Sequence, residues 1–328
     1  MPHHTSRSRR SAHSHMWIMG VVGVAAGAGL FLYAPSLAVI SRSLLLLAGF
    51  HVIGGLVLAS SLYVSGGRDL LRRWTRRKAS APRDETFDFG WGPGWMNGLA
   101  IAALVCLAGA ILAILTLPGL WPVAFLLVGM AVLLVAGNTI MRGFRRLDQV
   151  VLPMVDLLSG DHDLVLDAGC GSGRTSIALA RVLKAGRVIG LDRFDAAYID
   201  DGGRALLDRN LGLAGLLDKV AVEIGDLTAM PFGDATFDAA VSTHVYDHLG
   251  RDKARALSET LRVLKPGGRF LMAVWTPGWS MFAVANVLSL LLTSKAGWRR
   301  LATAAGFEIL DEGVFNHAWF VVLAKPRV

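Results

Sequence analysis

The sequence contains the stretch Leu164-Val-Leu-Asp-Ala-Gly-Cys-Gly-Ser-Gly173, an apolar run that ends in an acidic residue and three alternate glycines. The apolar part, 164–168, has the length of a buried β-strand, and the helical pattern of 175–183 follows it directly. Glycines at a strand-to-helix turn let the backbone approach a ligand and leave N–H groups free for a carboxylate or phosphate. The stretch therefore predicts a ligand-binding turn in an α/β domain.

Short apolar runs continue to alternate with helical stretches after this turn. Such alternation is typical of parallel strands whose sheet is covered by helices on both faces. The final two apolar runs, 307–315 and 318–324, predict a hairpin at one edge of the sheet. The other expected strands are 164–168, 187–192, 220–224, 237–242 and 269–274, and the expected helices are 175–183, 196–213 and 251–264.

Asp192 ends the second expected strand, nineteen residues beyond Gly173. A carboxylate at this place can accept hydrogen bonds from both hydroxyls of a ribose, so the pair of features predicts a nucleoside site. The glycines do not follow the G-x-G-x-x-G spacing that suits a pyrophosphate, and this disfavours a nicotinamide dinucleotide.

Five segments, in order, resemble the class I S-adenosylmethionine-dependent methyltransferases. They are 165–173, 190–192, 225–232 with 237–238, 261–270 and 305–307, and the resemblance extends over 161–325. It implies a Rossmann-like sheet of seven strands with the last strand antiparallel, and S-adenosyl-L-methionine as the cofactor. It does not cover the N-terminal half of the chain.

The resemblance also implies a set of cofactor-binding residues. The glycines would line the methionine and ribose, Asp192 would hold the ribose, and Asp226 with Leu227 would contact the adenine. Asp167 would either order the turn or approach the amino group of the cofactor, whose positive charge a carboxylate complements. Cys170 would contribute its backbone and not a nucleophile, and no metal site is expected. The full set is Asp167, Gly169, Cys170, Gly171, Gly173, Asp192, Arg193, Asp226, Leu227 and Thr243.

Methyl transfer from a sulfonium needs alignment of donor and acceptor, and it needs a general base only if the acceptor loses a proton. Candidates lie in 242–249, where the fourth expected strand ends and ligands gather in open α/β sheets. We expect His248 or Asp247 to act as the base, with His244 and Tyr246 also within reach of the cleft. The alternative is that these residues line the pocket or cap the next helix, since the family often places a structural histidine at the position of His248.

The chain is too apolar on average for an ordinary cytosolic enzyme. Hydrophobic residues make up 53% of the chain, and four uncharged segments are long enough to cross a hydrocarbon core of about 30 Å. A soluble helical bundle is disfavoured because these segments show no polar face. The predicted organisation is a basic tail (1–16), a transmembrane region (17–147, with spans near 17–34, 44–64, 98–117 and 120–141) and a methyltransferase domain (148–328).

Arginine and lysine concentrate in the tail, in 68–83 and in 142–146, whereas the two opposite loops contain only Arg42. Because cytoplasmic loops are enriched in basic residues, this places both termini and the methyltransferase domain in the cytoplasm, with the spans in the cell (inner) membrane. The net charge of +8 is then explained by an anionic membrane surface, and nucleic acid is not an expected partner. Residues 68–78 fit either a helix lying on the membrane or a solvated basic loop.

A membrane region is of most use to a methyltransferase whose acceptor lies in the membrane. The expected acceptor is therefore lipid-like: a quinone or other isoprenoid ring, or a phospholipid amine. A membrane-bound sensor or scaffold that binds S-adenosylmethionine without turnover is the alternative. The apolar stretch 279–293 fits either a substrate-covering helix that dips into the membrane interface or a helix packed on the sheet.

Overall fold

The computed structural model describes residues 87–90, 93–116, 119, 121–143, 157–158, 160, 162–195 and 203–327, and the single positions 29, 41, 42 and 45. The chain divides into two compact units, Met1–Trp74 with Gly98–Val135, and Thr75–Asn97 with Ala136–Val328. The predicted tail, the predicted spans 17–34 and 44–64 and the basic segment 68–78 lie outside the described residues, apart from isolated positions.

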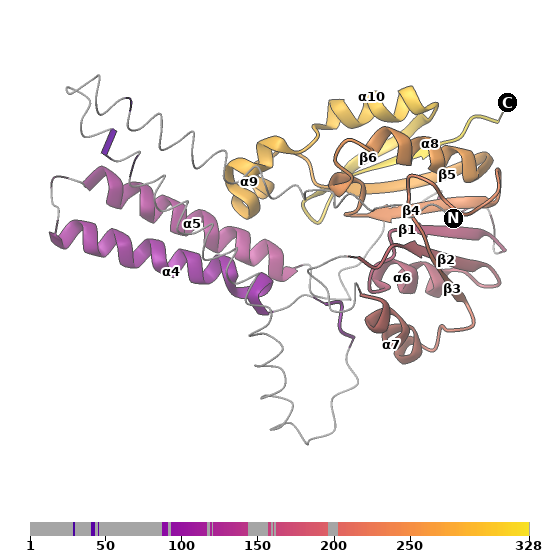
Figure 1. The fold of residues 1–328 in the computed structure, drawn as a ribbon, viewed down its shortest axis with the longest axis horizontal. Coiled ribbons are helices and arrows are strands. Elements are labelled where there is room, and N and C mark those ends of the chain that lie inside the picture. Colours follow the sequence, from indigo (N-terminus) through magenta and orange to yellow (C-terminus); the bar gives the residue numbers. More distant parts are fainter. Residues whose placement is uncertain are drawn as a thin grey trace, which may run out of the picture. The chain divides into compact units, whose positions relative to one another are not determined.

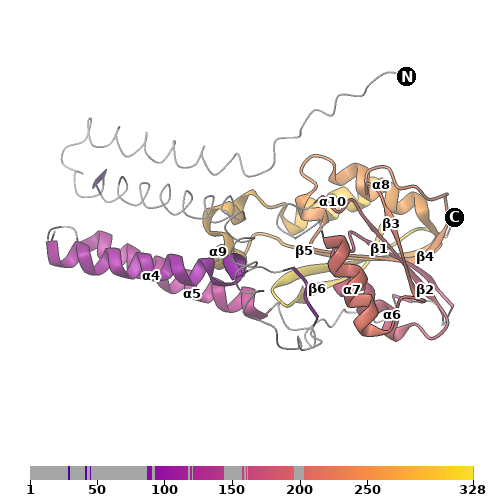
Figure 2. The same ribbon diagram turned by 60° about the horizontal axis from the view of Figure 1, so that its bottom comes forward.

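Two long apolar helices, α4 (Pro93–Thr116) and α5 (Trp121–Gly143), correspond to the predicted spans 98–117 and 120–141. Within them, Asn97–Thr116 and Trp121–Met141 are long and apolar enough to cross a membrane. The helices lie side by side (Figures 1 and 2) and pack through a cluster rich in small side chains, as helices in lipid do. The buried members are Ala103, Cys106, Ala110, Val123, Ala124, Leu127, Ala131 and Leu134.

The outer faces of both helices are apolar as well. Leu104, Leu115 and Phe125 are 66%, 76% and 73% exposed. A soluble protein rarely leaves so many large apolar side chains in water, whereas lipid accommodates them without cost. The helices therefore have the surface of membrane spans, which agrees with the sequence prediction for this pair.

The second unit contains a seven-stranded sheet in the order β3-β2-β1-β4-β5-β7-β6. β1 to β5 are parallel, and β7 runs antiparallel to both β5 and β6, as the resemblance implied. The order reverses between β1 and β4, the place where open α/β sheets bind ligands. The strands are β1 (Leu164–Ala168), β2 (Arg187–Asp192), β3 (Val220–Ile224), β4 (Phe237–Thr243), β5 (Leu264–Val274), β6 (Glu308–Phe315) and β7 (Ala318–Ala324).

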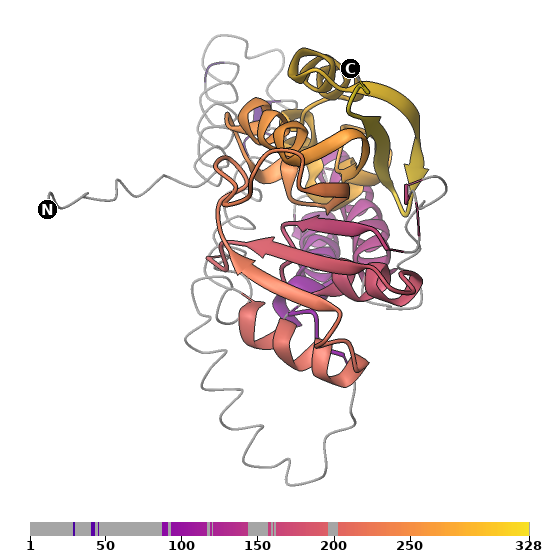
Figure 3. The same cartoon turned by 90° about the vertical axis from the view of Figure 1, so that its right-hand side faces the viewer.

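Helices cover both faces of this sheet (Figure 3). Alternate strand residues point into two separate cores, because successive side chains of a strand face opposite sides. Val165 and Leu271 lie in the core with α6 and α7, whereas Leu166 and Phe270 lie in the core with α8 and α10. The helices are α6 (Arg174–Val182), α7 (Arg204–Ala214), α8 (Lys253–Val263), α9 (Trp279–Ala285) and α10 (Lys295–Ala305), with 3-10 turns η6 (Tyr246–His248) and η7 (Asn286–Leu291).

Three differences from the sequence prediction concern helices. The helix expected at 196–213 begins at Arg204, after Gly203 with a left-handed φ of 97°, and 196–202 lie outside the described residues. The stretch 279–293 is not one helix, because α9 gives way to the tighter η7 at Asn286, a residue that favours turns over helix interiors. The sequence analysis also missed α10, whose Trp298 and Ala302 are buried against the sheet.

Candidate functional site

The glycine turn joins β1 to α6 at the point where the strand order reverses. Gly169, Gly171 and Gly173 have φ values of 88°, 49° and 87°, a left-handed conformation that glycine adopts without strain. A Cβ on Gly169 would lie 2.5 Å from Val245 Cγ2, and one on Gly173 would overlap Leu207, whereas a Cβ on Gly171 would meet nothing within 4 Å. Gly169 and Gly173 are therefore required for packing, and Gly171 is the glycine that faces open space.

Asp167 lies beneath this turn and is fully buried. Its Oδ2 accepts a hydrogen bond of 2.5 Å from the Ser176 hydroxyl in the first turns of α6. Its Oδ1 is buried and has no hydrogen-bond partner among the described residues. Burial raises the pKa of Asp167, the Ser176 hydrogen bond lowers it and the nearby charge of Asp192 raises it, so that the pKa lies at about 7. The hydrogen bond with Ser176 fits a role of Asp167 in ordering the turn. The unpartnered oxygen fits the other predicted role, which is contact with the amino group of the cofactor.

Asp192 closes the turn from the end of β2. Its Oδ2 accepts a hydrogen bond from the Gly171 N–H at 2.9 Å, and its Oδ1 accepts one from the Phe194 N–H at 2.8 Å. A carboxylate has about four acceptor positions, so two remain for the hydroxyls of a ribose. The structure thus brings together the acid and the glycine that the sequence analysis assigned to one nucleoside site.

Cys170 lies between these glycines with its side chain buried. A Cβ on Gly190 of β2 would lie only 2.9 Å from the Cys170 sulfur, so Gly190 provides the space that the thiol fills. Burial raises the pKa of the Cys170 thiol, which keeps it protonated. A protonated, buried thiol is a poor nucleophile, in keeping with the expectation that Cys170 acts through its backbone.

The loop after β3 carries the predicted adenine contacts. Asp226 Oδ1 accepts hydrogen bonds of 2.8 Å from both the N–H and the hydroxyl of Thr228, and Leu227 is buried in the core. Arg193, which follows Asp192, lies 3.6 Å from the Asp226 carboxylate and 3.0 Å from Asp195. These contacts join the ends of β2 and β3 at one side of the glycine turn.

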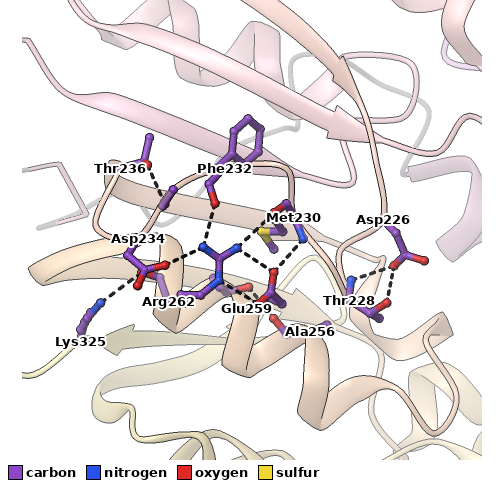
Figure 4. A network of polar contacts seen from close by, with 12 residues as sticks. Asp226, Thr228, Met230, Phe232, Asp234, Thr236, Ala256, Glu259, Arg262 and Lys325 are labelled. Carbon is purple, nitrogen blue, oxygen red and sulfur yellow. Dashed lines mark hydrogen bonds and ion pairs between the residues drawn. The ribbon is translucent and has the colours of Figure 1, made fainter.

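Arg262 of α8 holds this loop in place (Figure 4). Its guanidinium donates hydrogen bonds to the carbonyl oxygens of Phe232 and Met230, at 2.8 Å and 3.2 Å, and binds the carboxylates of Asp234 and Glu259. Glu259 in turn accepts a hydrogen bond from the Met230 N–H. The network fixes the backbone that presents Asp226, and the sequence analysis did not detect it because the partners lie some thirty residues apart in the chain.

The catalytic candidates follow β4. Asp247 is 9% exposed, and its Oδ2 accepts a hydrogen bond from the Trp275 N–H at 3.2 Å, while its Oδ1 is buried without a partner among the described residues. His248 is exposed, and its N–H donates to the carbonyl of Val245. Thr243 shares a hydrogen bond of 2.7 Å with Thr175 in the first turn of α6. The two candidate bases, adjacent in sequence, therefore have different surroundings.

His244 is a further residue at this edge. It has a φ of 57°, unusual for a residue with a side chain, and its ring lies 4.7 Å from that of Trp275. Burial lowers the pKa of His244 to about 4, so the imidazole is neutral at physiological pH. Backbone strain of this kind concentrates at functional sites. The contact with Trp275 could not be predicted from the sequence near His244, because Trp275 follows a different strand, β5.

A segment far from the α/β domain in sequence also contributes to the turn. The Ser172 hydroxyl donates to the carbonyl of Phe89, and the side chain of Asn210 binds both the N–H and the carbonyl of Asp88. Asn210 also donates to the carbonyl of Ser172, and the Arg174 guanidinium lies 6.0 Å from the Phe89 ring. Residues 87–90, just before α4, thus cover the glycine turn, a contact that no local pattern indicates.

Comparisons with known proteins agree with this geometry. A family model described as a methyltransferase domain matches residues 166–272. A protein of Mycolicibacterium smegmatis, named as an S-adenosylmethionine-dependent methyltransferase, is 34% identical over 53% of this chain and 63% of its own length. One of Encephalitozoon cuniculi, named as a methyltransferase, is 30% identical over 50% of this chain and 79% of its own.

A third relative is a demethylmenaquinone methyltransferase of Lactiplantibacillus plantarum, which is 39% identical over 37% of this chain and 47% of its own length. The chain thus spans less than two thirds of the length of two of these three relatives. The family match begins at 166 and so leaves α4 and α5 outside it.

Proposed function

Because the chain belongs to the S-adenosylmethionine-dependent methyltransferase family, we propose that it is an integral membrane enzyme that methylates a lipid-like acceptor. The observation that carries the proposal is the presence, in one chain, of a methyltransferase domain and of two helices long and apolar enough to cross a membrane. A soluble acceptor would give such helices no role in the reaction.

The proposed membrane region has four spans, two of them α4 and α5. Its basic loops orient both termini and the methyltransferase domain toward the cytoplasm and toward anionic lipid. Cytoplasmic orientation would give the domain access to S-adenosylmethionine. A protease added to intact spheroplasts should therefore leave the domain uncut, and cleavage within it would contradict this orientation.

The name of the Lactiplantibacillus relative supports a lipid-like acceptor, since it identifies demethylmenaquinone as what that enzyme methylates. The acceptor proposed here is a membrane quinone, another isoprenoid ring or a phospholipid amine. These acceptors share an apolar body that lies in the bilayer and a nucleophilic atom near its surface.

S-adenosylmethionine supplies a methyl group on a sulfonium, so the carbon–sulfur bond breaks as the acceptor attacks and the sulfur leaves as a neutral thioether. The protein's part is to align the two partners and exclude water. Asp192 and the Gly171 backbone would hold the ribose, and Asp226 the adenine. Asp247, whose Oδ1 is unpartnered among the described residues, would orient the acceptor or accept its proton.

The test is mass spectrometry of lipid extracts from cells with and without the gene, after feeding methionine with a labelled methyl group. We expect one lipid to lose the label in the deletion strain and to regain it with the wild-type gene. Asp247→Asn, which keeps an acceptor for the Trp275 N–H, should fail to restore the label, whereas His162→Gln, at an exposed site before β1, should restore it. An unchanged lipid profile in the deletion strain would contradict a lipid acceptor.

Variants at the two candidate bases also distinguish the proposed enzyme from the alternative, a sensor or scaffold that binds S-adenosylmethionine without turnover. If the protein is an enzyme, Asp247→Asn and His248→Gln bind S-adenosylmethionine normally while at least one of them abolishes transfer. If no condition yields transfer from wild-type protein that binds the cofactor, the sensor is favoured.

A further inference from the structure

The segment between β5 and α10 exposes several large apolar side chains. Residues 275–294 contain no acidic or basic side chain, and they form α9 and η7. Trp279, Leu290 and Leu291 are 87%, 70% and 59% exposed, although each would be expected to be covered in a soluble enzyme. In two views α9 lies beyond the carboxyl end of β5, outside the layers formed by the sheet with α8 and α10 (Figures 1 and 2).

Polar contacts fasten this segment to the α/β domain at both ends. The Lys253 ammonium at the start of α8 donates a hydrogen bond of 2.9 Å to the Thr293 hydroxyl. The Ser280 hydroxyl lies 2.9 Å from His317 Nδ1 in the hairpin of β6 and β7. The exposed apolar side chains are therefore held on an ordered segment, as a docking surface requires.

These exposed side chains fit contact with the membrane interface better than exposure to water or a full crossing of the bilayer. Trp279–Ala285 and Leu288–Ala305 together are apolar enough for a membrane span, but they are bent by 117°. The α10 part of the second piece, Lys295–Ala305, cannot enter the bilayer, because its Trp298 and Ala302 are buried in the domain core and Arg299 pairs with Glu312. Only α9 and η7 (Trp279–Leu291) remain available, and so short a segment suits the membrane interface and not a full crossing of the bilayer.

We propose that Trp279, Leu290 and Leu291 insert into the membrane interface, so that the acceptor reaches the site from the lipid. A tryptophan with an apolar body and a polar N–H is the side chain that interfaces favour. The path of the chain connects the inserted side chains to the proposed acceptor site. The N–H of Trp275 binds Asp247, and Trp275 lies four residues before Trp279. This inference rests on the proposed function, in which α4 and α5 cross the membrane and so hold the domain beside the bilayer.

The test measures the depth of each side chain in the full-length protein in nanodiscs of equal phosphatidylcholine and phosphatidylglycerol. Trp279→Cys, Leu290→Cys and Leu291→Cys are each given a nitroxide label, with Leu217→Cys as the control. Leu217 is 59% exposed, matching Leu291, but lies between α7 and β3. Wild-type protein, whose Cys106 and Cys170 are buried, serves as the labelling blank.

Labels at the three positions should collide several-fold more often with oxygen than with a water-soluble nickel chelate, and the label at Leu217 should show the reverse. Equal, water-like accessibility at all four sites would overturn the proposal. The depth of a label is measured without any methyl transfer, so the proposed insertion and the proposed lipid methylation can be refuted separately. Water-exposed labels with intact lipid methylation refute only the insertion, and inserted labels without any lipid methylation refute only the proposed function.

A second variant, Trp279→Glu with Leu290→Glu, tests whether the acceptor reaches the site from the lipid. S-adenosylmethionine binding should stay within two-fold of wild type, because neither residue belongs to the turn and loops that carry the proposed cofactor contacts. Methyl incorporation into lipid should fall at least ten-fold. Unchanged incorporation would overturn entry from the lipid.

Discussion

Asp167→Asn should make the α/β domain more stable at neutral pH. The carboxyl of Asp167 is fully buried, and burial raises its pKa from an ordinary value of 3.8 to about 7. Folding therefore takes up a proton between about pH 4 and pH 7, and stability falls as the pH rises through this range. At about 1.4 kcal/mol for each pH unit, ionised Asp167 destabilises the domain by up to about 4 kcal/mol above pH 7.

Asparagine carries no such charge and can still accept the hydrogen bond from the Ser176 hydroxyl. The variant should match wild type near pH 3, exceed it by about 1 kcal/mol at pH 4.5 and by up to about 4 kcal/mol at pH 8, the last a shift in urea midpoint on the order of 1–2 M. Pulse proteolysis of the full-length protein in detergent, across urea concentrations and at several pH values, measures this. Parallel pH profiles, or a variant less stable than wild type at pH 8, would refute a buried and destabilised Asp167.

The same variant separates the two roles predicted for Asp167. If the carboxylate complements the cofactor's amino group, Asp167→Asn weakens S-adenosylmethionine binding by roughly ten-fold or more, since a charge-assisted hydrogen bond is lost. Wild-type affinity should then rise with pH through about 7. If Asp167 only orders the turn, affinity is unchanged and calorimetric titration shows no such pH dependence.

Three further substitutions test the framework of the site. Gly169→Ala should cost about 2–4 kcal/mol and abolish S-adenosylmethionine binding, because Gly169 has a left-handed φ and a tight contact with Val245. Gly212→Ala, in helix α7 with open space around it, should leave binding unchanged and should not lower stability. Arg262→Met should weaken cofactor binding several-fold and cost about 2–3 kcal/mol, measured by calorimetric titration and urea unfolding, and a loop held by other contacts would show neither loss. Asn210→Ala should cost about 3 kcal/mol and raise protease cleavage within residues 87–90, and unchanged cleavage would contradict the docking of that segment.

The local sequence pattern predicted the bounds of most strands, and it failed where pairing with a neighbouring strand decides where a strand begins. β1, β2, β3 and β7 have the predicted bounds, because each is a short apolar run between turn residues. β5 begins at Leu264 and not at 269, although a proline and two glycines follow. Leu264 pairs with Phe237 across an irregular register, and a partner strand is not visible in the local sequence.

The meeting of Gly171 and Asp192, which the sequence analysis assigned to the cofactor, could be predicted because both residues follow strand ends. Gly171 and Asp192 meet since β1 and β2 are parallel neighbours whose carboxyl ends share one edge. The supports of this part of the site could not be found in the same way. Asn210 and Asp88 are 122 residues apart, and nothing in either neighbourhood indicates the other.

The acceptor half shows why residue type alone does not identify a base. Asp247 and His248 are neighbours in sequence, yet the 3-10 turn that carries them buries the carboxylate and exposes the imidazole. A group excluded from water interacts more strongly with a developing charge than an exposed group does. Between the two predicted bases the geometry therefore favours Asp247. It adds the neutral, half-buried His244, whose ring lies against Trp275 at the same edge.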